Sequence, residues 1–225
     1  MKPIAYIRTP FPTKFGIPRQ SNIVNGLEAT IVFEPEYRQP EAFRGLDDFD
    51  YIWILWQFSG NLRDTWSPTV RPPRLGGNRR MGVFATRSPF RPNPIGLSSV
   101  RLLGVDLHTV DGPVLRVSGA DLMDGTPVYD IKPYIPYTDA HPEARSGFAP
   151  NPAGRLLNVE CPSELSALLS ESLRQTLFEV LAHDPRPSYQ HDSERVYVFE
   201  FDCYEIKFNV NGNVLTIVDI LPVKK

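Results

Sequence analysis

Two arginines and one asparagine stand among three prolines in residues 87–94, Arg-Ser-Pro-Phe-Arg-Pro-Asn-Pro. Each proline fixes its own φ, removes a backbone donor and biases the residue before it toward extended geometry. The stretch is therefore a stiff loop and not a helix. Its guanidinium groups are planar donors that suit phosphate or carboxylate. A solvated surface crossover is the simpler interpretation, but rigidity combined with anion-binding donors favours a binding loop.

The loop belongs to a longer basic stretch. Seven of the 24 basic residues are arginines between residues 65 and 105, where there is no Asp or Glu. They are Arg71, Arg74, Arg79, Arg80, Arg87, Arg91 and Arg101. The whole chain has a net charge of −2, so the remainder is acidic. A basic island in an acidic chain predicts a phosphate-binding patch.

Cysteine and histidine usage argues against a metal centre. Cys161 and Cys203 have no metal-ligand spacing, and the four histidines are scattered along the chain. Two cysteines in a chain of 225 residues are typical of a reducing compartment. The N-terminus does not show the pattern of a signal peptide, and no window is apolar enough to span a membrane. We therefore expect a cytoplasmic protein without a metal or a membrane segment.

The N-terminal half alternates short apolar runs with loops. Strands are predicted at residues 4–8, 28–33, 50–58, 81–86, 95–107, 113–119 and 128–131, and one helical turn at 41–46. No long helix separates these strands, which predicts an antiparallel sheet closed into a small barrel. A dinucleotide fold is not expected, because Gly76-Gly77 does not lie between a strand and a helix.

The C-terminal part has a different pattern. Residues 138–161 are polar and contain Pro and Gly, which is typical of a linker. Leucines at three- and four-residue steps predict a helix at 163–182, followed by strands at 195–201, 204–210 and 214–220. The sequence thus predicts a mainly β chain with a barrel domain over residues 1–150 and a small α+β domain over residues 156–225. We expect that deleting 156–225 leaves the barrel's ligand binding nearly intact.

Five blocks in this order carry a family resemblance. They are FGIPRQ (15–20), DYIWILWQF (50–58), RMGVFATRSPFRPNPIGLS (80–98), DLMDGTPVYDIKPYIPY (121–137) and DPRPSY (184–189). The chain resembles the bacterial TrmO family, also called YaeB or TsaA. The resemblance implies an S-adenosylmethionine-dependent methyltransferase that acts on N6-threonylcarbamoyl-adenosine at position 37 of threonine tRNA. It further implies a small β-barrel without a Rossmann fold, a homodimer, and a C-terminal domain with the DPRPxY motif.

The resemblance also implies the cofactor-binding residues. They are Pro18, Arg19, Gln20, Ser59, Gly60, Arg87, Leu97, Asp121, Leu122, Met123, Asp124, Gly125 and Thr126. The methionine carboxylate of S-adenosylmethionine needs a bidentate donor, which Arg19 or Arg87 can supply. The ribose diol and the sulfonium need acceptors, which Asp121 and Asp124 can supply. Asn93 is the candidate for holding the exocyclic amine of the target adenine, and a turn-forming role is equally compatible with it.

RNA contacts are expected from the arginines and from aromatic residues on loops. The anticodon stem-loop presents unpaired bases, which proteins bind by stacking and by phosphate contacts. The candidates are Arg71, Arg74, Arg79, Arg80, Arg91, Arg186 and Tyr189, with Phe90, Tyr134 and Tyr137 as further stacking candidates. The alternative to an enzyme is a β-barrel regulator that binds a nucleotide or RNA without turnover.

Overall fold

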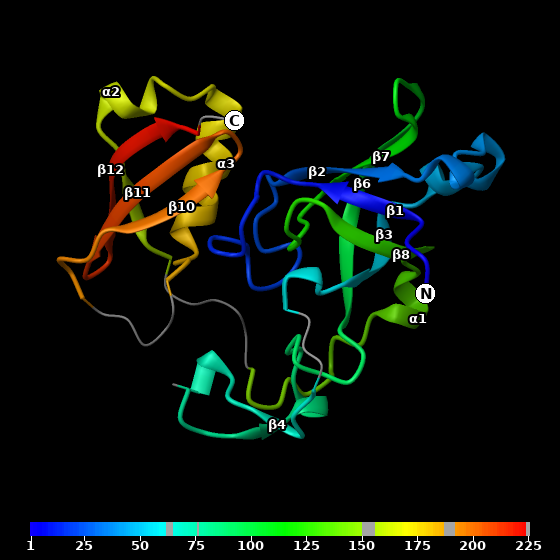
Figure 1. Cartoon of the computed structure of the whole chain (residues 1–225), viewed down its shortest axis with the longest axis horizontal. Coiled ribbons are helices and arrows are strands. Elements are labelled where there is room, and N and C mark those ends of the chain that lie inside the picture. The colour runs from blue at the N-terminus through cyan, green and yellow to red at the C-terminus, as the bar shows by residue number, and fades with distance from the viewer. Residues whose placement is uncertain (62–64, 76, 150–155, 187–191, 224–225) are drawn as a thin grey trace.

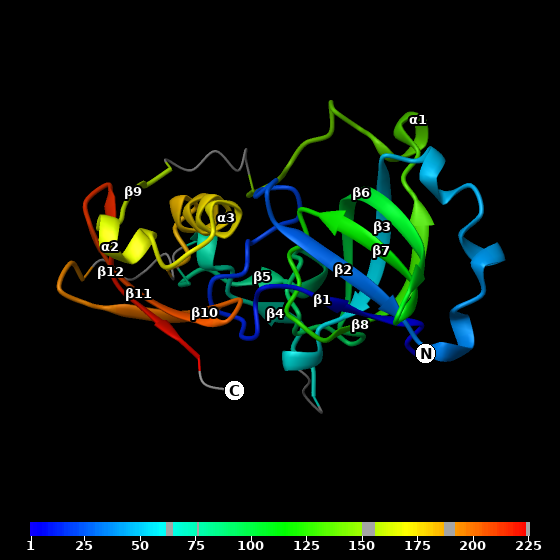
Figure 2. The same cartoon turned by 90° about the horizontal axis from the view of Figure 1, so that it is seen from above.

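The computed structural model describes residues 1–61, 65–75, 77–149, 156–186 and 192–223. The chain forms a β-barrel and a smaller helix-on-sheet unit that lie side by side (Figures 1 and 2). The prediction of a mainly β chain with a small antiparallel barrel is confirmed. Within the described residues, no helix is long and apolar enough to cross a membrane.

The barrel is a closed antiparallel sheet of six strands in the order β1-β2-β7-β6-β3-β8. The strands are β1 (Ala5–Arg8), β2 (Glu28–Phe33), β3 (Tyr51–Gln57), β6 (Ile95–Thr109), β7 (Gly112–Ser118) and β8 (Thr126–Pro133). Closure leaves no free edge among these six strands. The three loops that later frame the site follow β1, β3 and β7.

Side-chain alternation along β3 fills the barrel. Ile52, Ile54 and Trp56 are buried, whereas the residues between them are partly exposed. Trp56 pairs in register with Gly96 of β6. A Cβ at position 96 would lie 2.2 Å from the Trp56 ring, so only glycine admits the indole there. The Trp56 ring consequently lies at the end of the barrel where β3 finishes.

The structure corrects the strand predicted at residues 81–86. Only β5 (Met81–Gly82) is extended, and it pairs with β4 (Thr69–Val70). Residues Val83–Ala85 form the 3₁₀ helix η6. Of residues 81–86 only Val83 is buried, so the apolar pattern has no core to face along its length.

Three further predictions differ in detail from the structure. The helical turn near 41–46 is two 3₁₀ helices, η2 (Pro40–Phe43) and η3 (Leu46–Asp48), preceded by η1 (Pro35–Tyr37). The linker predicted at 138–161 overlaps the end of α1 (Pro136–Asp139) and contains β9 (Asn158–Glu160). The helix predicted at 163–182 is two helices, α2 (Ser163–Ser166) and α3 (Glu171–Ala182). The second helix begins where the Ser170 hydroxyl accepts a hydrogen bond from the Leu173 N–H.

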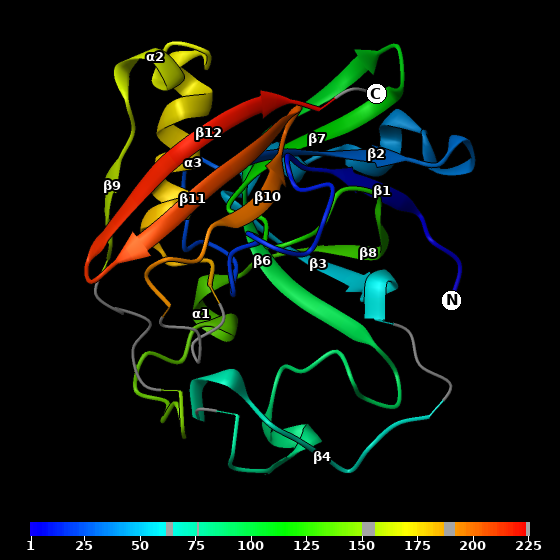
Figure 3. The same cartoon turned by 60° about the vertical axis from the view of Figure 1, so that its left-hand side comes forward.

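The C-terminal unit packs α3 against a four-stranded sheet (Figure 3). Its strands are β10 (Tyr197–Phe201), β11 (Tyr204–Asn211) and β12 (Val214–Pro222), with β9 added in parallel beside β12. The core of this unit also contains Phe11, Val24 and Leu27, each 1% exposed or less. The loop after β1 therefore belongs by sequence to the first predicted domain and by packing to the second core.

Candidate functional site

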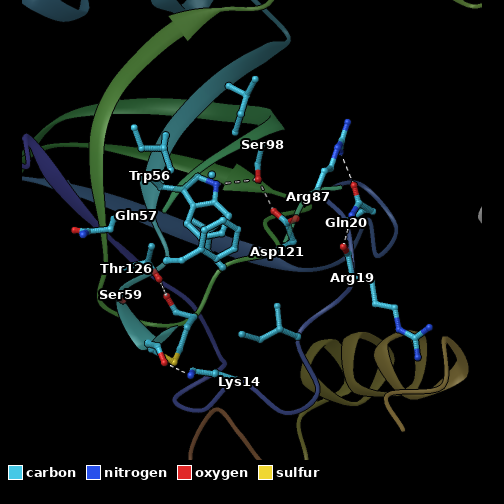
Figure 4. A pocket seen from close by; sticks show the side chains of 18 of the residues that line it. Lys14, Arg19, Gln20, Trp56, Gln57, Ser59, Arg87, Ser98, Asp121 and Thr126 are labelled. Carbon is cyan, nitrogen blue, oxygen red and sulfur yellow. Dashed lines mark hydrogen bonds between the residues drawn. The ribbon is translucent and has the colours of Figure 1, made fainter. Parts of the chain in front are cut away.

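A cavity of about 470 Å³ opens at one end of the barrel (Figure 4). Its walls come from the loop after β1, the ends of β3 and β6, η4 (Ser59–Asn61), and the loops before β6 and β8. Eleven of the expected cofactor-binding residues line it: Pro18, Arg19, Gln20, Ser59, Gly60, Arg87, Leu97, Asp121, Leu122, Met123 and Thr126. The fold therefore brings together segments that lie far apart in the sequence.

A buried chain of hydrogen bonds forms the barrel wall of the cavity. The Trp56 indole N–H donates to Ser98 Oγ at 3.0 Å, and the Ser98 hydroxyl donates to Asp121 Oδ1 at 2.6 Å. Trp56 also contacts Phe58 edge to face, with ring centroids 4.3 Å apart. Figure 4 shows Ser98 between Trp56 and Asp121, joined to each by a dashed hydrogen bond. The network fixes the position of the Asp121 carboxylate.

The Asp121 carboxylate lies in a poorly solvated place. Burial raises its pKa above the usual range for aspartate, while the Ser98 hydrogen bond and the charge of Arg87 act in the opposite direction. The carboxylate thus needs a cationic or hydrogen-bonding partner to remain charged without penalty. An acceptor of this kind suits a ligand that presents hydroxyls or a positive charge.

Arg87 is the basic group beside this carboxylate. Its guanidinium is exposed and donates to the side-chain oxygen of Gln20, across the mouth of the cavity. The Gln20 amide in turn donates to the Arg19 carbonyl at 2.6 Å. In Figure 4, Arg87, Gln20 and Asp121 lie close together. An acceptor and a planar cation therefore face the same space.

Arg19 lines the cavity with its backbone side, but its guanidinium points away toward α3 (Figure 4). Its Nη2 donates to the Arg186 carbonyl at 2.9 Å. The Arg186 guanidinium is buried and forms two hydrogen bonds with Asp184, at 2.8 and 2.9 Å. Of the two arginines expected to donate to the ligand, only Arg87 directs its guanidinium toward the cavity mouth. Two of the donors of Arg186, which was expected to contact RNA, are thus occupied by Asp184.

The C-terminal unit holds the rest of the same loop. Phe15 stacks on Tyr197 and meets Phe199 edge to face. Gly16 has a φ of +96° and lies so close to Phe199 that a Cβ would stand 2.5 Å from the ring. Glu179 of α3 accepts hydrogen bonds from the backbone N–H groups of Asn25 and Gly26, at 2.9 and 3.2 Å. The loop wall of the cavity is thus positioned by residues of the C-terminal unit.

Three expected site residues lie outside the cavity. Asp124 accepts from the Thr9 N–H at 3.0 Å, and the Gly125 N–H donates to the Ile7 carbonyl at 2.9 Å, so both tie the loop before β8 to β1. Asn93 is exposed and does not line the cavity. Its carbonyl accepts from the Ile95 N–H at 2.8 Å, which agrees with the turn-forming alternative.

Apart from Arg186, the arginines expected to contact RNA whose side chains are described lie in two places. Arg91 lines the cavity and donates to the Thr86 carbonyl at 3.0 Å. Arg71, Arg79 and Arg80 are exposed on the segment that carries β4 and β5. Tyr189 lies outside the described residues, as does the side chain of Arg74.

Ten residues that line the cavity were not predicted from the sequence. They are Lys14, Ile17, Trp53, Trp56, Gln57, Phe58, Thr86, Ile95, Gly96 and Ser98. The one available signal was Ser98, a polar residue at an inward position of β6 between the buried Gly96 and Val100. A buried hydroxyl at such a position needs a partner, which Asp121 and Trp56 provide.

Comparison with known families decides the classification. Residues 6–140 match the model of the tRNA-methyltransferase O N-terminal domain, and residues 156–223 match that of the TrmO C-terminal domain. The chain belongs to the TrmO family. The tRNA (adenine(37)-N6)-methyltransferase of Escherichia coli strain K12 is 43% identical over 215 residues, which cover 92% of this chain and 91% of that protein.

Two further relatives agree with this membership. A Pseudomonas aeruginosa protein described as a putative S-adenosylmethionine-dependent methyltransferase, RcsF, is 45% identical over 84% of this chain and 83% of its own length. The crystal structure of TrmO from P. aeruginosa superposes with a TM-score of 0.77 at 34% identity, and covers 98% of this chain and 95% of that one. The expected family resemblance is therefore confirmed.

Proposed function

We propose that this protein transfers a methyl group from S-adenosylmethionine to N6 of the adenosine at position 37 of tRNA. The proposed substrate is the threonylcarbamoyl form of that adenosine in threonine tRNA. The single observation that carries the proposal is the cavity at the barrel mouth, where the TrmO sequence blocks converge around Asp121 and Arg87. The Escherichia coli relative, which is named for this reaction, supports the assignment.

The side chains of the cavity fit the proposed cofactor. A volume of about 470 Å³ lies within the range of small-molecule sites. Arg87 would hold the methionine carboxylate, since its guanidinium can donate two parallel hydrogen bonds. Asp121 would accept from the ribose hydroxyls or neutralise the positive sulfur, and Leu97 and Ile95 provide apolar surface. When bound, the cofactor supplies an electrophilic methyl group.

The residues of this chain act mainly by positioning. A displacement at a methyl carbon requires the two reactants in line, and holding them there supplies most of the rate. Ser98 and Trp56 keep the Asp121 carboxylate in one orientation, because the Trp56 N–H donates to Ser98 and the Ser98 hydroxyl donates to Asp121. Gln20 restrains Arg87 at the rim. The target base enters beside the proline loop, whose stiffness limits the loss of conformational freedom on binding.

We extend the proposal to the partner and the assembly. The anticodon stem-loop of tRNA is the partner, and the family resemblance implies a homodimer that works in the cytoplasm. Size-exclusion chromatography with light scattering tests the dimer directly. A monomer that retains full methylation would remove the homodimer from the proposal without affecting the reaction.

Mass spectrometry of tRNA nucleosides tests the reaction. Threonine tRNA from cells that lack this protein should contain threonylcarbamoyl-adenosine without the additional methyl group. The purified protein with labelled S-adenosylmethionine should restore that methyl group in the same tRNA. An Arg87→Ala variant is the matched negative control. A wild-type protein that binds the cofactor and RNA but does not methylate the RNA would support the regulator alternative.

A further inference from the structure

Two exposed aromatic rings lie on a projecting segment that we call the arm, residues 65–75 and 77–86. Figures 1 and 3 show the arm extending away from the barrel and from the C-terminal sheet. Trp66 is 51% exposed and Phe84 is 73% exposed. Their ring centroids are 6.2 Å apart and their planes differ by 30°. Two large aromatic side chains held together in solvent mark an interaction surface.

The arm holds the two rings in a fixed arrangement. Its strands β4 and β5 pair in register, and the Val83 N–H continues the pairing by donating to the Pro68 carbonyl at 2.9 Å. Val83 is 1% exposed and anchors this end of the hairpin. The Thr86 hydroxyl closes η6 by donating to the Val83 carbonyl at 2.8 Å. Trp66 and Phe84 stand next to these paired residues, so the rings are positioned before any partner binds.

The charges on the arm favour a nucleic acid as the partner. Arg71, Arg79 and Arg80 are exposed, and the stretch from residue 65 to residue 105 contains no Asp or Glu. Within the described part of the chain, none of these three guanidiniums forms an ion pair with a carboxylate; Arg80 donates to the Thr69 hydroxyl. Stacked rings on a segment that also presents exposed cations are the features that bind unpaired bases and their phosphates.

The arm is joined directly to the rim of the cavity. Phe84 precedes Thr86 by two residues, and the Thr86 carbonyl accepts a hydrogen bond from Arg91 at 3.0 Å. Thr86, Arg87 and Arg91 all line the cavity. We infer that Trp66 and Phe84 form a stacking platform for unpaired bases of the anticodon loop that flank the nucleotide entering the cavity. This inference rests on the proposed function.

Binding of two RNA probes tests the platform: an anticodon stem-loop, and a fully paired duplex of the same stem sequence. Trp66→Ala and Phe84→Ala should each weaken stem-loop binding about 5- to 100-fold, the usual effect of removing one stacking ring. Duplex binding should change much less, because its bases are not available for stacking. Tyr6→Ala, which removes a 40% exposed ring from the outer face of β1, is the matched control and should bind both probes normally.

Two additional variants separate stacking from other roles. Phe84→Leu keeps most of the apolar volume but removes the ring, so it should bind as weakly as Phe84→Ala; Phe84→Tyr should restore binding. The salt dependence of affinity should keep its slope in the ring variants. It should flatten by roughly 0.7–0.9 of a log–log unit in Arg71→Ala if that residue contacts one phosphate. Cofactor binding should be unchanged in all of these variants.

The outcomes are distinct. Normal stem-loop binding by Trp66→Ala and Phe84→Leu would overturn the platform. A loss of binding that coincides with conversion of a dimer to monomers, seen by light scattering, would also overturn it and assign the rings to a second copy of this chain. If the wild-type protein binds the stem-loop through these rings but does not methylate it, the proposed reaction fails and the platform stands.

Discussion

The two walls of the cavity are held in place by different parts of the molecule. The barrel wall is self-contained, since Trp56, Ser98 and Asp121 satisfy one another within the barrel. The loop wall depends on distant residues, because Phe15 packs on β10 and Arg19 donates to the Arg186 carbonyl. One wall is therefore positioned by local strand pairing, and the other by the C-terminal unit. The C-terminal unit therefore helps to build the cavity that we propose as the cofactor site.

Of the changes that test this difference between the walls, deletion of residues 156–225 should lower cofactor affinity the most. It would remove the partners of Phe11, Val24 and Leu27, whose burial stabilises the loop wall by about 1.5–3 kcal/mol for each side chain. The loop would lose its ordered conformation, and cofactor affinity should fall about 100-fold or more. Calorimetric titration measures the affinity, and circular dichroism checks that the barrel strands remain.

The sequence alone led to the opposite expectation, namely that this truncation leaves cofactor binding nearly intact. That expectation treated the loop after β1 as part of the barrel, whereas Phe11, Val24 and Leu27 lie in the C-terminal core. Full cofactor affinity in a truncated, folded barrel would show that the loop wall forms without the C-terminal unit.

The two arginines at the mouth should differ in their effects. Arg87→Ala should weaken cofactor binding by about 1.5–3 kcal/mol, the usual scale for a charge-assisted hydrogen bond. Arg19→Ala should weaken it by only about 1 kcal/mol, because it removes one hydrogen bond that positions the loop. Arg116→Ala, on the outside of the barrel and paired with Asp106, is the control. Equal losses for Arg87 and Arg19 would mean that both guanidiniums bind the ligand.

The smallest effect should appear in the free energy of unfolding of Asp121→Asn. Burial raises the pKa of Asp121 in the folded protein, so the folded state holds its proton to higher pH than the unfolded state does. Wild-type stability should therefore decrease as the pH rises from the usual aspartate range through the raised pKa. The asparagine variant has no carboxylate to ionise, so its stability should not decrease in this way. The difference in free energy of unfolding between the variant and the wild type should therefore grow as the pH rises through this range, and should disappear below it. Urea denaturation across this pH range measures the difference; a constant difference would contradict the assignment.

The sequence predicted the barrel well because its strands follow simple rules. β2 has the predicted bounds, and most of the expected cofactor residues line one cavity. The prediction of a strand at 81–86 was wrong because only Val83 of these residues is buried. The direction of the Arg19 side chain could not be predicted, because its acceptor is the backbone carbonyl of Arg186, 167 positions away in the sequence. The hydrogen bond from Ser98 to Asp121 could not be predicted, because the two residues meet only when the barrel has formed.

The separation between Arg19 and Arg186 has a consequence for synthesis of the chain. The loop after β1 is synthesised well before the side chains that cover it, because these lie far downstream in the chain. Closing so long a loop costs entropy that only the completed C-terminal core repays. The nascent barrel therefore exposes Phe11, Val24 and Leu27 until the C-terminal core has been synthesised. A fragment that stops before this core should therefore fail to order the loop wall, and ligand binding should report that the C-terminal unit has folded.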